Sequence, residues 1–206
     1  MENNKTGGLF QRLVLMAMIV VVPGVSWYFL YNGMQYRKKS LSELSDYGVV
    51  APFSAKSLNT KLITQDSLVD KITVVAFVTN QNDADEQLML KNQEKLYTQF
   101  QERKDVYFLT FVEADSSATY EIAKKGNLLK SRSYVMSCNA EEIKKYMNDF
   151  KVSEFSKPYL KFVFLDSSTK IRKMYEANDP EVLKRMVEHI AMKLPLEKTP
   201  YPVVKH

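Results

Sequence analysis

The chain has 206 residues, a formal net charge of +5 and a single cysteine, Cys138. One cysteine excludes an intramolecular disulfide and a metal cluster held by several thiolates. The mild positive charge is spread along the chain, with no run of lysine and arginine interleaved with aromatic residues, so nucleic-acid binding is not predicted.

An uncharged apolar run occupies residues 13–31. Its 19 residues come close to the ~20 that a helix needs to cross ~30 Å of hydrocarbon. Trp27 and Tyr28 lie near one end, where amphipathic rings favour the membrane interface. We therefore predict a transmembrane anchor at residues 13–31, preceded by a cytoplasmic segment at residues 1–12. The alternative is a cleaved signal peptide, but residues 23–27 (PGVSW) lack a small-x-small cleavage pattern.

Two less regular segments flank the remaining chain. Residues 32–45 are polar and charged and are predicted to form a linker. Three prolines interrupt residues 195–206, which are predicted to form an irregular tail. A single folded domain is predicted between them, at residues 46–194.

Five stretches of this domain are predicted to be strands. The first two are nearly continuous apolar runs, as a strand buried on both faces requires. The last two flank a polar turn and are predicted to pair as a hairpin. The five stretches are residues 72–78, 106–112, 134–136, 160–165 and 171–175.

Three stretches are predicted to be helices, and two of them have clear N-terminal signals. Asn139 can cap a helix, and Glu142 follows three residues later, as in a capping box. Asp179 and Pro180 suit the cap and the first position of the last helix. The remaining helix, at residues 84–103, has apolar residues along one face.

The order of these elements is strand, helix, strand, short strand, helix, hairpin and closing helix. The strand–helix–strand part implies a parallel pair joined by a right-handed crossover, and the hairpin adds antiparallel strands. This order predicts an α/β domain, a thioredoxin-like mixed sheet flanked by helices, joined to one N-terminal transmembrane helix.

Several segments of the domain have the character of one known family, in the same order. They are residues 47–53 (YGVVAPF), 71–79 (KITVVAFVT), 106–112 (VYFLTFV), 162–166 (FVFLD), 171–175 (IRKMY) and 178–182 (NDPEV). In this order they resemble the SCO/SenC family, which are thioredoxin-like, membrane-anchored copper chaperones for cytochrome c oxidase. The resemblance covers residues 46–194. It implies a single-pass protein of the bacterial inner membrane whose domain faces the periplasm.

The resemblance also implies where a metal site would lie. The family binds copper through a Cys-x-x-x-Cys after the first core strand and a distant histidine before the late hairpin. Here these positions hold Gln81 and Asp85, and Pro158. Amide and carboxylate oxygens are hard ligands that hold Cu(I) poorly, and dithiol exchange needs two thiols. We therefore expect a degenerate site without metal, cofactor or catalytic residue.

Pro158 also carries an expectation about the backbone. Thioredoxin-like folds commonly have a cis-proline in the loop that faces the active site, and Pro158 directly precedes the strand predicted at residues 160–165. An X–Pro bond is held in cis at a cost of only ~0.5–1 kcal/mol. We predict that the Lys157–Pro158 bond is cis and that its loop adjoins residues 80–85.

Other polar residues each have two interpretations. Cys138 lies at a strand-to-helix junction, where a helix N-terminus would lower its pKa and make it a reactive thiol; alternatively it is a half-buried small residue. Asp83, Asp85 and Glu86 suit a hard cation, or simply complement the dipole of the helix that they begin. His189 is predicted to be a structural or surface residue.

We therefore expect a non-catalytic, membrane-anchored SCO-like protein that is an assembly or scaffold partner of a respiratory membrane complex such as cytochrome oxidase. One alternative is a copper carrier whose ligands are reassigned to Cys138 and methionines. However, Met16 and Met18 fall in the span, Met89, Met147 and Met186 fall on core faces, and the methionines form no Met-x-x-Met series. The other is a thiol enzyme that uses Cys138 alone. The sequence does not identify the protein partner.

Overall fold

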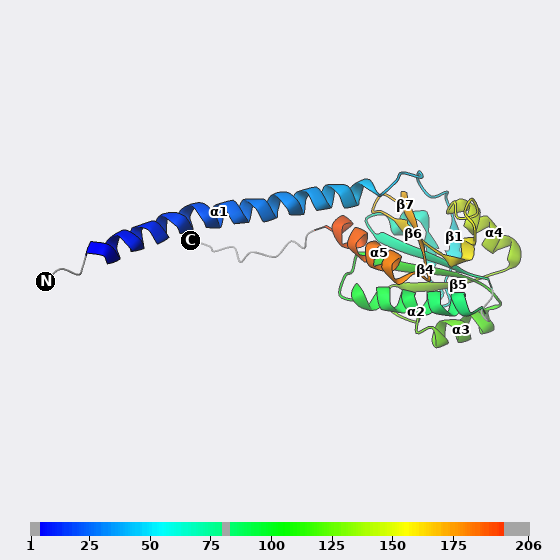
Figure 1. The fold of residues 1–206 in the computed structure, drawn as a ribbon. Helices are drawn as coiled ribbons and strands as arrows, with labels where there is room; N and C mark the ends of the chain where they lie inside the picture. Colours follow the sequence, from blue (N-terminus) through cyan, green and yellow to red (C-terminus); the bar gives the residue numbers. More distant parts are fainter. Residues whose placement is uncertain (1–4, 80–82, 196–206) are drawn as a thin grey trace, which may run out of the picture. The chain divides into compact units, whose positions relative to one another are not determined.

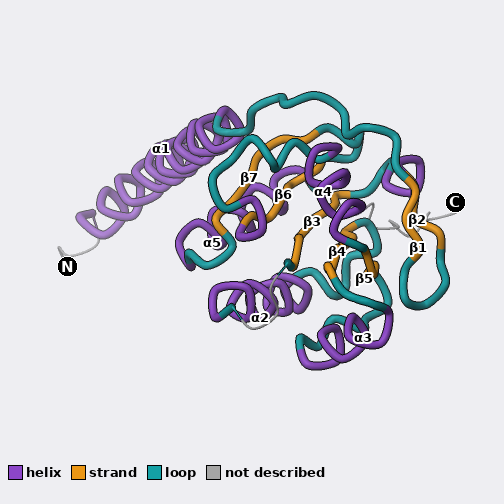
Figure 2. The backbone as a smooth tube through the Cα atoms, turned by 90° about the vertical axis from the view of Figure 1, so that its right-hand side faces the viewer, coloured by secondary structure: helices purple, strands orange, loops and turns teal. Residues whose placement is uncertain are grey.

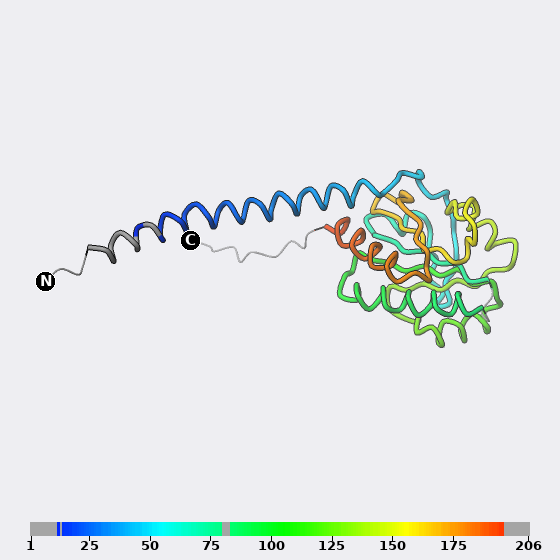
Figure 3. Tube along the Cα trace, in the orientation of Figure 1, coloured from blue at the N-terminus to red at the C-terminus, as the bar shows by residue number. Residues whose placement is uncertain are grey.

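The computed structural model describes residues 5–79 and 83–195, with the backbone alone for residues 5–11 and 13. The chain forms two compact units, Met1–Glu43 and Leu44–His206, and each is described by itself. Figure 1 labels the helices and strands, and Figure 3 follows the chain through them from the N-terminus to the C-terminus.

The first unit consists of one helix, α1 (Lys5–Ser42). Its part Val14–Ser42 is long and apolar enough to cross a membrane, and it contains an 18-residue window with a mean hydropathy of 2.0. Trp27 is 70% exposed, which suits a ring that inserts at a lipid–water interface. Pro23 lies inside the helix, as membrane spans tolerate.

The helix α1 continues into the segment that was expected to be a linker. It ends at Ser42, so most of residues 32–45 is helical. The physical reason is local, because residues 34–41 are rich in straight-chain residues with high helix propensity. At the helix end, Ser42 Oγ donates a hydrogen bond to the carbonyl oxygen of Lys39 at 2.7 Å.

Sodium carbonate extraction tests the role of α1. Since α1 carries a long uncharged run, we expect the full-length protein to stay in the membrane pellet at alkaline pH. Insertion of two lysines near Val21 should move it to the soluble fraction, because each charge at the centre of a span costs about 2.5–3.5 kcal/mol. Recovery of the unaltered protein as a shortened soluble species would show instead that the run is a cleaved signal.

The second unit is built on a five-stranded mixed sheet with the strand order β5-β4-β3-β6-β7. The central strand β3 runs parallel to β4 and antiparallel to β6; β4 and β5 are parallel, and β6 and β7 are antiparallel. This arrangement confirms the predicted mixed α/β sheet. The strands are β3 (Ile72–Val78), β4 (Val106–Glu113), β5 (Ser133–Cys138), β6 (Lys161–Leu165) and β7 (Ile171–Glu176).

Helices cover both faces of this sheet. Figure 2 shows α4 on one side, and α2 and α5 on the other. The predicted caps are confirmed: the Asn139 side chain accepts from the backbone of Glu141 and Glu142, and the Asp179 side chain accepts from two amides of the last helix. The helices are α2 (Ala84–Gln99), α3 (Ser116–Lys125), α4 (Ala140–Asp149) and α5 (Pro180–Lys193).

An aromatic cluster fills the space between the sheet and α4. Phe77 of β3 and Phe111 of β4 are stacked, with ring centroids 5.3 Å apart. Phe111 also lies 4.6 Å from the ring of Tyr146 on α4, and Phe150 contacts both phenylalanines. Because these rings come from both layers, their burial joins the sheet to the helix.

Three elements were not predicted. The helix α3 begins at the cap Asp115, whose side chain accepts from the amide of Ala118 at 2.8 Å. Strands β1 (Ser54–Lys56) and β2 (Leu62–Thr64) form a separate antiparallel hairpin. The strands have three residues each, too few for an alternating pattern to be read from sequence. The helix α3 buries only Thr119, Ile122 and Ala123, which do not form an apolar stripe.

The prediction of a cis peptide bond before Pro158 is wrong. No peptide bond within the described residues is cis, so Lys157–Pro158 is trans. Pro158 instead begins the 3₁₀ turn η2 (Pro158–Leu160), after Lys157 in the left-handed region at φ 51°. The first position of a helical turn suits proline because its φ is already appropriate and its missing N–H has no intrahelical partner there.

Candidate functional site

The candidate site lies where the chain leaves the central strand β3. Strands β3, β4 and β5 are parallel, so their carboxyl ends share one edge of the sheet, the usual position of ligand sites in α/β proteins. Residues 79–83 connect β3 to α2 at this edge. Gln81, one of the three degenerate metal positions, lies outside the described residues.

The turn that contains Pro158 lies beside this connection. The antiparallel register of β3 with β6 pairs Thr73 with Leu165 and Val75 with Val163. If this register is continued beyond the paired residues, the end of β3 lies opposite the turn η2. Cα atoms of η2 come within 8 Å of those of both β3 and α2. Pro158 therefore lies next to the two elements that flank the connection, although the contact expected with residues 80–82 is outside the described part.

Glu86 joins the two ends of the β3–α2 connection. Its side chain is only 1% exposed. One carboxylate oxygen accepts from the backbone N–H of Thr79 at 2.9 Å, and the other accepts from the Thr79 hydroxyl at 2.9 Å. Hydrogen bonds to a carboxylate are stronger than those between neutral groups. This pair therefore holds the first turn of α2 against the end of β3.

The aspartates of the connection have different roles. The Asp83 side chain caps α2, accepting from the backbone N–H groups of Asp85 at 2.8 Å and Glu86 at 3.3 Å. Asp85 is half-buried in the first turn. Among the described residues, no group of three His, Cys, Asp or Glu side chains is arranged to hold a metal ion. The geometry supports helix capping and dipole complementation.

Cys138 lies at the carboxyl end of β5, two strands away from β3, about 10 Å along the sheet. Its side chain is 4% exposed. Burial in the protein interior, and then the carboxylate of Glu142, raise the pKa of the thiol from 9.0 to about 12, although a backbone hydrogen bond from Val112 opposes this. The effect of burial therefore exceeds any lowering by the N-terminus of α4.

His189 is buried inside the unit. It is 0% exposed, whereas Val187, which the apolar spacing also places near the core, is only half-buried. The Nδ1 atom of His189 lies 2.6 Å from the Tyr175 hydroxyl, so this hydrogen bond joins α5 to β7. The contact supports a structural role for His189.

Sequence analysis missed a set of buried polar side chains along α2. Asn92 Nδ2 donates to the carbonyl oxygen of Ala177 at 2.9 Å, and Gln93 Nε2 donates to Thr110 Oγ1 at 2.7 Å. Together with Glu86, these residues fasten α2 to the sheet. A signal was present in the spacing, because Glu86 and Gln93 are seven residues apart and share a helix face with the buried Met89.

Comparison with proteins of known structure identifies the fold. No family model and no curated protein matches the chain. Among solved structures, a SCO1/SenC family lipoprotein from Bacillus anthracis is similar, with a TM-score of 0.58, 20% identity, and coverage of 70% of this chain and 94% of the other. BsSco, a member of the Sco family of cytochrome c oxidase assembly proteins, has a TM-score of 0.58, 15% identity, and coverage of 73% and 98%.

Thiol-disulfide proteins are similar to a comparable degree. The thioredoxin domain of a thiol-disulfide oxidoreductase from Bacteroides vulgatus has a TM-score of 0.54 and 13% identity, with 70% of this chain and 96% of the other covered. At such identities the likeness establishes the fold and leaves the activity to the site. The second unit is thus a thioredoxin-like domain, and SCO/SenC structures are among those that it resembles.

Glu86→Gln tests the junction between β3 and α2. A glutamine side chain has a similar shape but no charge and only one acceptor oxygen, so both Thr79 donors lose the carboxylate and one of them faces an NH2 group. We expect the free energy of unfolding to fall by about 1–3 kcal/mol, measured by denaturant titration followed by circular dichroism. Glu141→Gln, on the exposed first turn of α4, is the matched control and should change it by less than about 0.5 kcal/mol. Equal effects of the two substitutions would contradict this role.

Alkylation of Cys138 tests its buried environment. Because its pKa is raised to about 12, the thiolate fraction at pH 8 should be about 10³ lower than that of an ordinary cysteine. We expect iodoacetamide to react far more slowly with the native protein than with the urea-unfolded protein, with a rate that rises about tenfold per pH unit from pH 8 to 10. The folded state also holds this proton more tightly, so the thiol's contribution to stability declines as pH rises from 9.0 towards about 12. Equal native and unfolded rates at pH 8 would show a reactive thiol.

Proposed function

We propose that the chain is a membrane-anchored, non-catalytic SCO-like protein that assists the assembly of a respiratory membrane complex, namely cytochrome c oxidase. The observation that carries this proposal is a thioredoxin-like domain, similar to SCO/SenC structures among others, whose single cysteine is buried two strands away from the strand that precedes the family's thiolates. A domain without a second thiol has no dithiol chemistry. The surface around the β3–α2 connection and η2 is left to bind a protein.

The anchor supports the same proposal. The apolar helix α1 would hold the domain at the membrane in which a respiratory complex resides. We propose the bacterial inner membrane, with the domain on the periplasmic side, by analogy with the family that the sequence resembles. The similar structure from Bacillus anthracis is described as a lipoprotein, which is another form of membrane attachment.

Two other functions use Cys138 and are less well supported. A copper carrier with reassigned ligands needs several soft ligands around one point. A single-cysteine thiol enzyme needs an accessible thiolate, whereas burial raises the Cys138 pKa to about 12. Both alternatives need an accessible, deprotonated thiol, whereas the domain keeps the Cys138 thiol protonated and buried.

Complementation of a deletion strain separates these functions. In the bacterium that encodes the protein, loss of the gene should lower cytochrome c oxidase activity in the membranes. Cys138→Ala should restore that activity as fully as the unaltered chain, at equal protein levels by immunoblot, because the proposed role does not use the thiol. The tagged full-length protein should also retain oxidase subunits in mild detergent.

The remaining outcomes each decide against the proposal. Loss of complementation by Cys138→Ala at a normal protein level would favour the copper carrier or the thiol enzyme. Normal oxidase activity in the deletion strain, together with no oxidase subunits on the tagged protein, would exclude the proposed role altogether.

A further inference from the structure

A hollow lies between helices α2 and α3 on the surface of the domain. Its volume is about 570 Å³, within the range of ~300–1,000 Å³ that is usual for ligand sites. Figures 1 and 2 both show α2 and α3 side by side. Leu90 and Ile122, which are 7% and 6% exposed, contribute the apolar part of its lining. We call this space the α2–α3 groove.

The groove has a defined end. Asn127 Nδ2 donates to the Glu94 carboxylate, and the hydroxyls of Tyr97 and Ser131 are 3.2 Å apart. Both contacts involve the C-terminal half of α2. They fix α2 against the chain that follows α3, whereas the groove lies along the N-terminal half of α2. Gln87, the residue that follows Glu86 in α2, also lines the groove, so the groove begins beside the candidate site.

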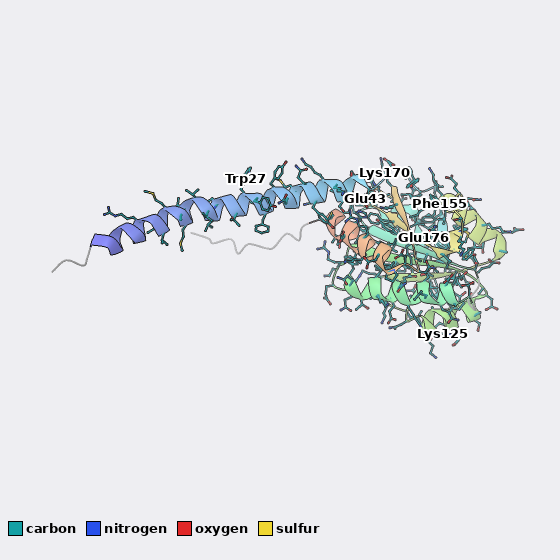
Figure 4. The ribbon with its side chains drawn as sticks, in the orientation of Figure 1. Trp27, Glu43, Lys125, Phe155, Lys170 and Glu176 are labelled. Carbon is teal, nitrogen blue, oxygen red and sulfur yellow. The ribbon has the colours of Figure 1, made fainter. Side chains whose placement is uncertain are left out.

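The rim of the groove is basic. Lys91 of α2 and Lys124 and Lys125 of α3 line it together with one acidic residue, Glu121. All three lysines are exposed, and Figure 4 labels Lys125 on α3. Within the part of the chain that the structure describes, none of the three has a carboxylate within 4.0 Å of its amino group. Among the described residues the lysines thus form no ion pair, and with Glu121 they give the groove a net positive lining.

We propose that the α2–α3 groove binds an acidic, amphipathic segment of a protein partner. Carboxylates of that segment would pair with the lysines, and its apolar side chains would pack on the lysine methylene stems and on the exposed edges of Leu90 and Ile122. A nucleic acid fits less well, because the described residues of the lining include no aromatic side chain on which a base could stack. This inference rests on the proposed function, since it assigns the chemistry of the surface that the assembly partner would contact.

The binding experiment uses full-length protein in neutral detergent and a fluorescent synthetic helix of leucine and glutamate, with leucines at i, i+3, i+4 and i+7. Fluorescence anisotropy, corrected for micelles alone, should show binding that weakens with added salt. The variant Lys91→Glu/Lys124→Glu/Lys125→Glu should bind at least about tenfold more weakly, because like charges then face each other. The same peptide with lysine in place of glutamate should not bind.

The matched control places the same three charge reversals elsewhere on the domain. Lys144→Glu/Lys145→Glu/Lys184→Glu changes exposed lysines of α4 and α5, so it has the same net charge as the groove variant. It should bind the peptide within about twofold of the unaltered protein. Thermal unfolding verifies that both variants are folded. Carbodiimide coupling of peptide carboxylates to lysine amines should label Lys91, Lys124 and Lys125 in the unaltered protein.

Several results would overturn the inference. Equal weakening by the two triple variants would show that only net charge matters, and no peptide binding at millimolar concentration would show that the groove is not a peptide site. Vesicles of phosphatidylglycerol that bind only through the groove lysines, with no such dependence for the peptide, would assign the groove to anionic lipid.

Co-purification from membranes separates this inference from the proposed function. Undiminished recovery of oxidase on the groove variant would refute the groove as the contact and leave the assembly role intact. Groove-dependent peptide binding without any oxidase on the unaltered protein would uphold the groove and refute the assembly role.

Discussion

The burial of strand β3 on both faces is the constraint on which the domain depends. All seven residues of Ile72–Val78 are buried, and the strand pairs with β4 on one side and β6 on the other. A strand in this position needs a helical layer on each face. The aromatic cluster with α4 supplies one layer, and α2 and α5 supply the other. Because β3 is central, its exit determines where the candidate site lies.

The polar anchors of α2 connect this constraint to the site. Glu86, Asn92 and Gln93 are buried and bonded to the sheet or to the loop after β7. Each would be costly to bury without a partner, so together they specify one position of the helix. The N-terminus of α2 is thereby held against Thr79. The contact between Glu86 and Thr79 that holds it there uses neither a thiol nor a metal.

The surface around α2 carries opposite charges on two adjacent parts of the helix. The start of the helix is acidic, with Asp83 at the N-cap and Asp85 in the first turn, whereas the following residues border the basic α2–α3 groove. Opposite charges on neighbouring surfaces favour one orientation of a charged partner over others. The thioredoxin-like fold determines where α2 lies, and the charged side chains of α2 distinguish this surface from that of other proteins with the same fold.

The sequence by itself determined the apolar N-terminal run, the core strands, the caps Asn139 and Asp179 and the lack of a second thiol, because each depends on residues close together in the chain. Only the tertiary structure decided the trans bond before Pro158, the burial of Cys138 and His189, and the contact of Glu86 with Thr79. The α2–α3 groove is of the same kind, since Glu94 and Asn127 are 33 residues apart. These features depend on how distant segments pack, and local propensity and periodicity carry no information about that packing.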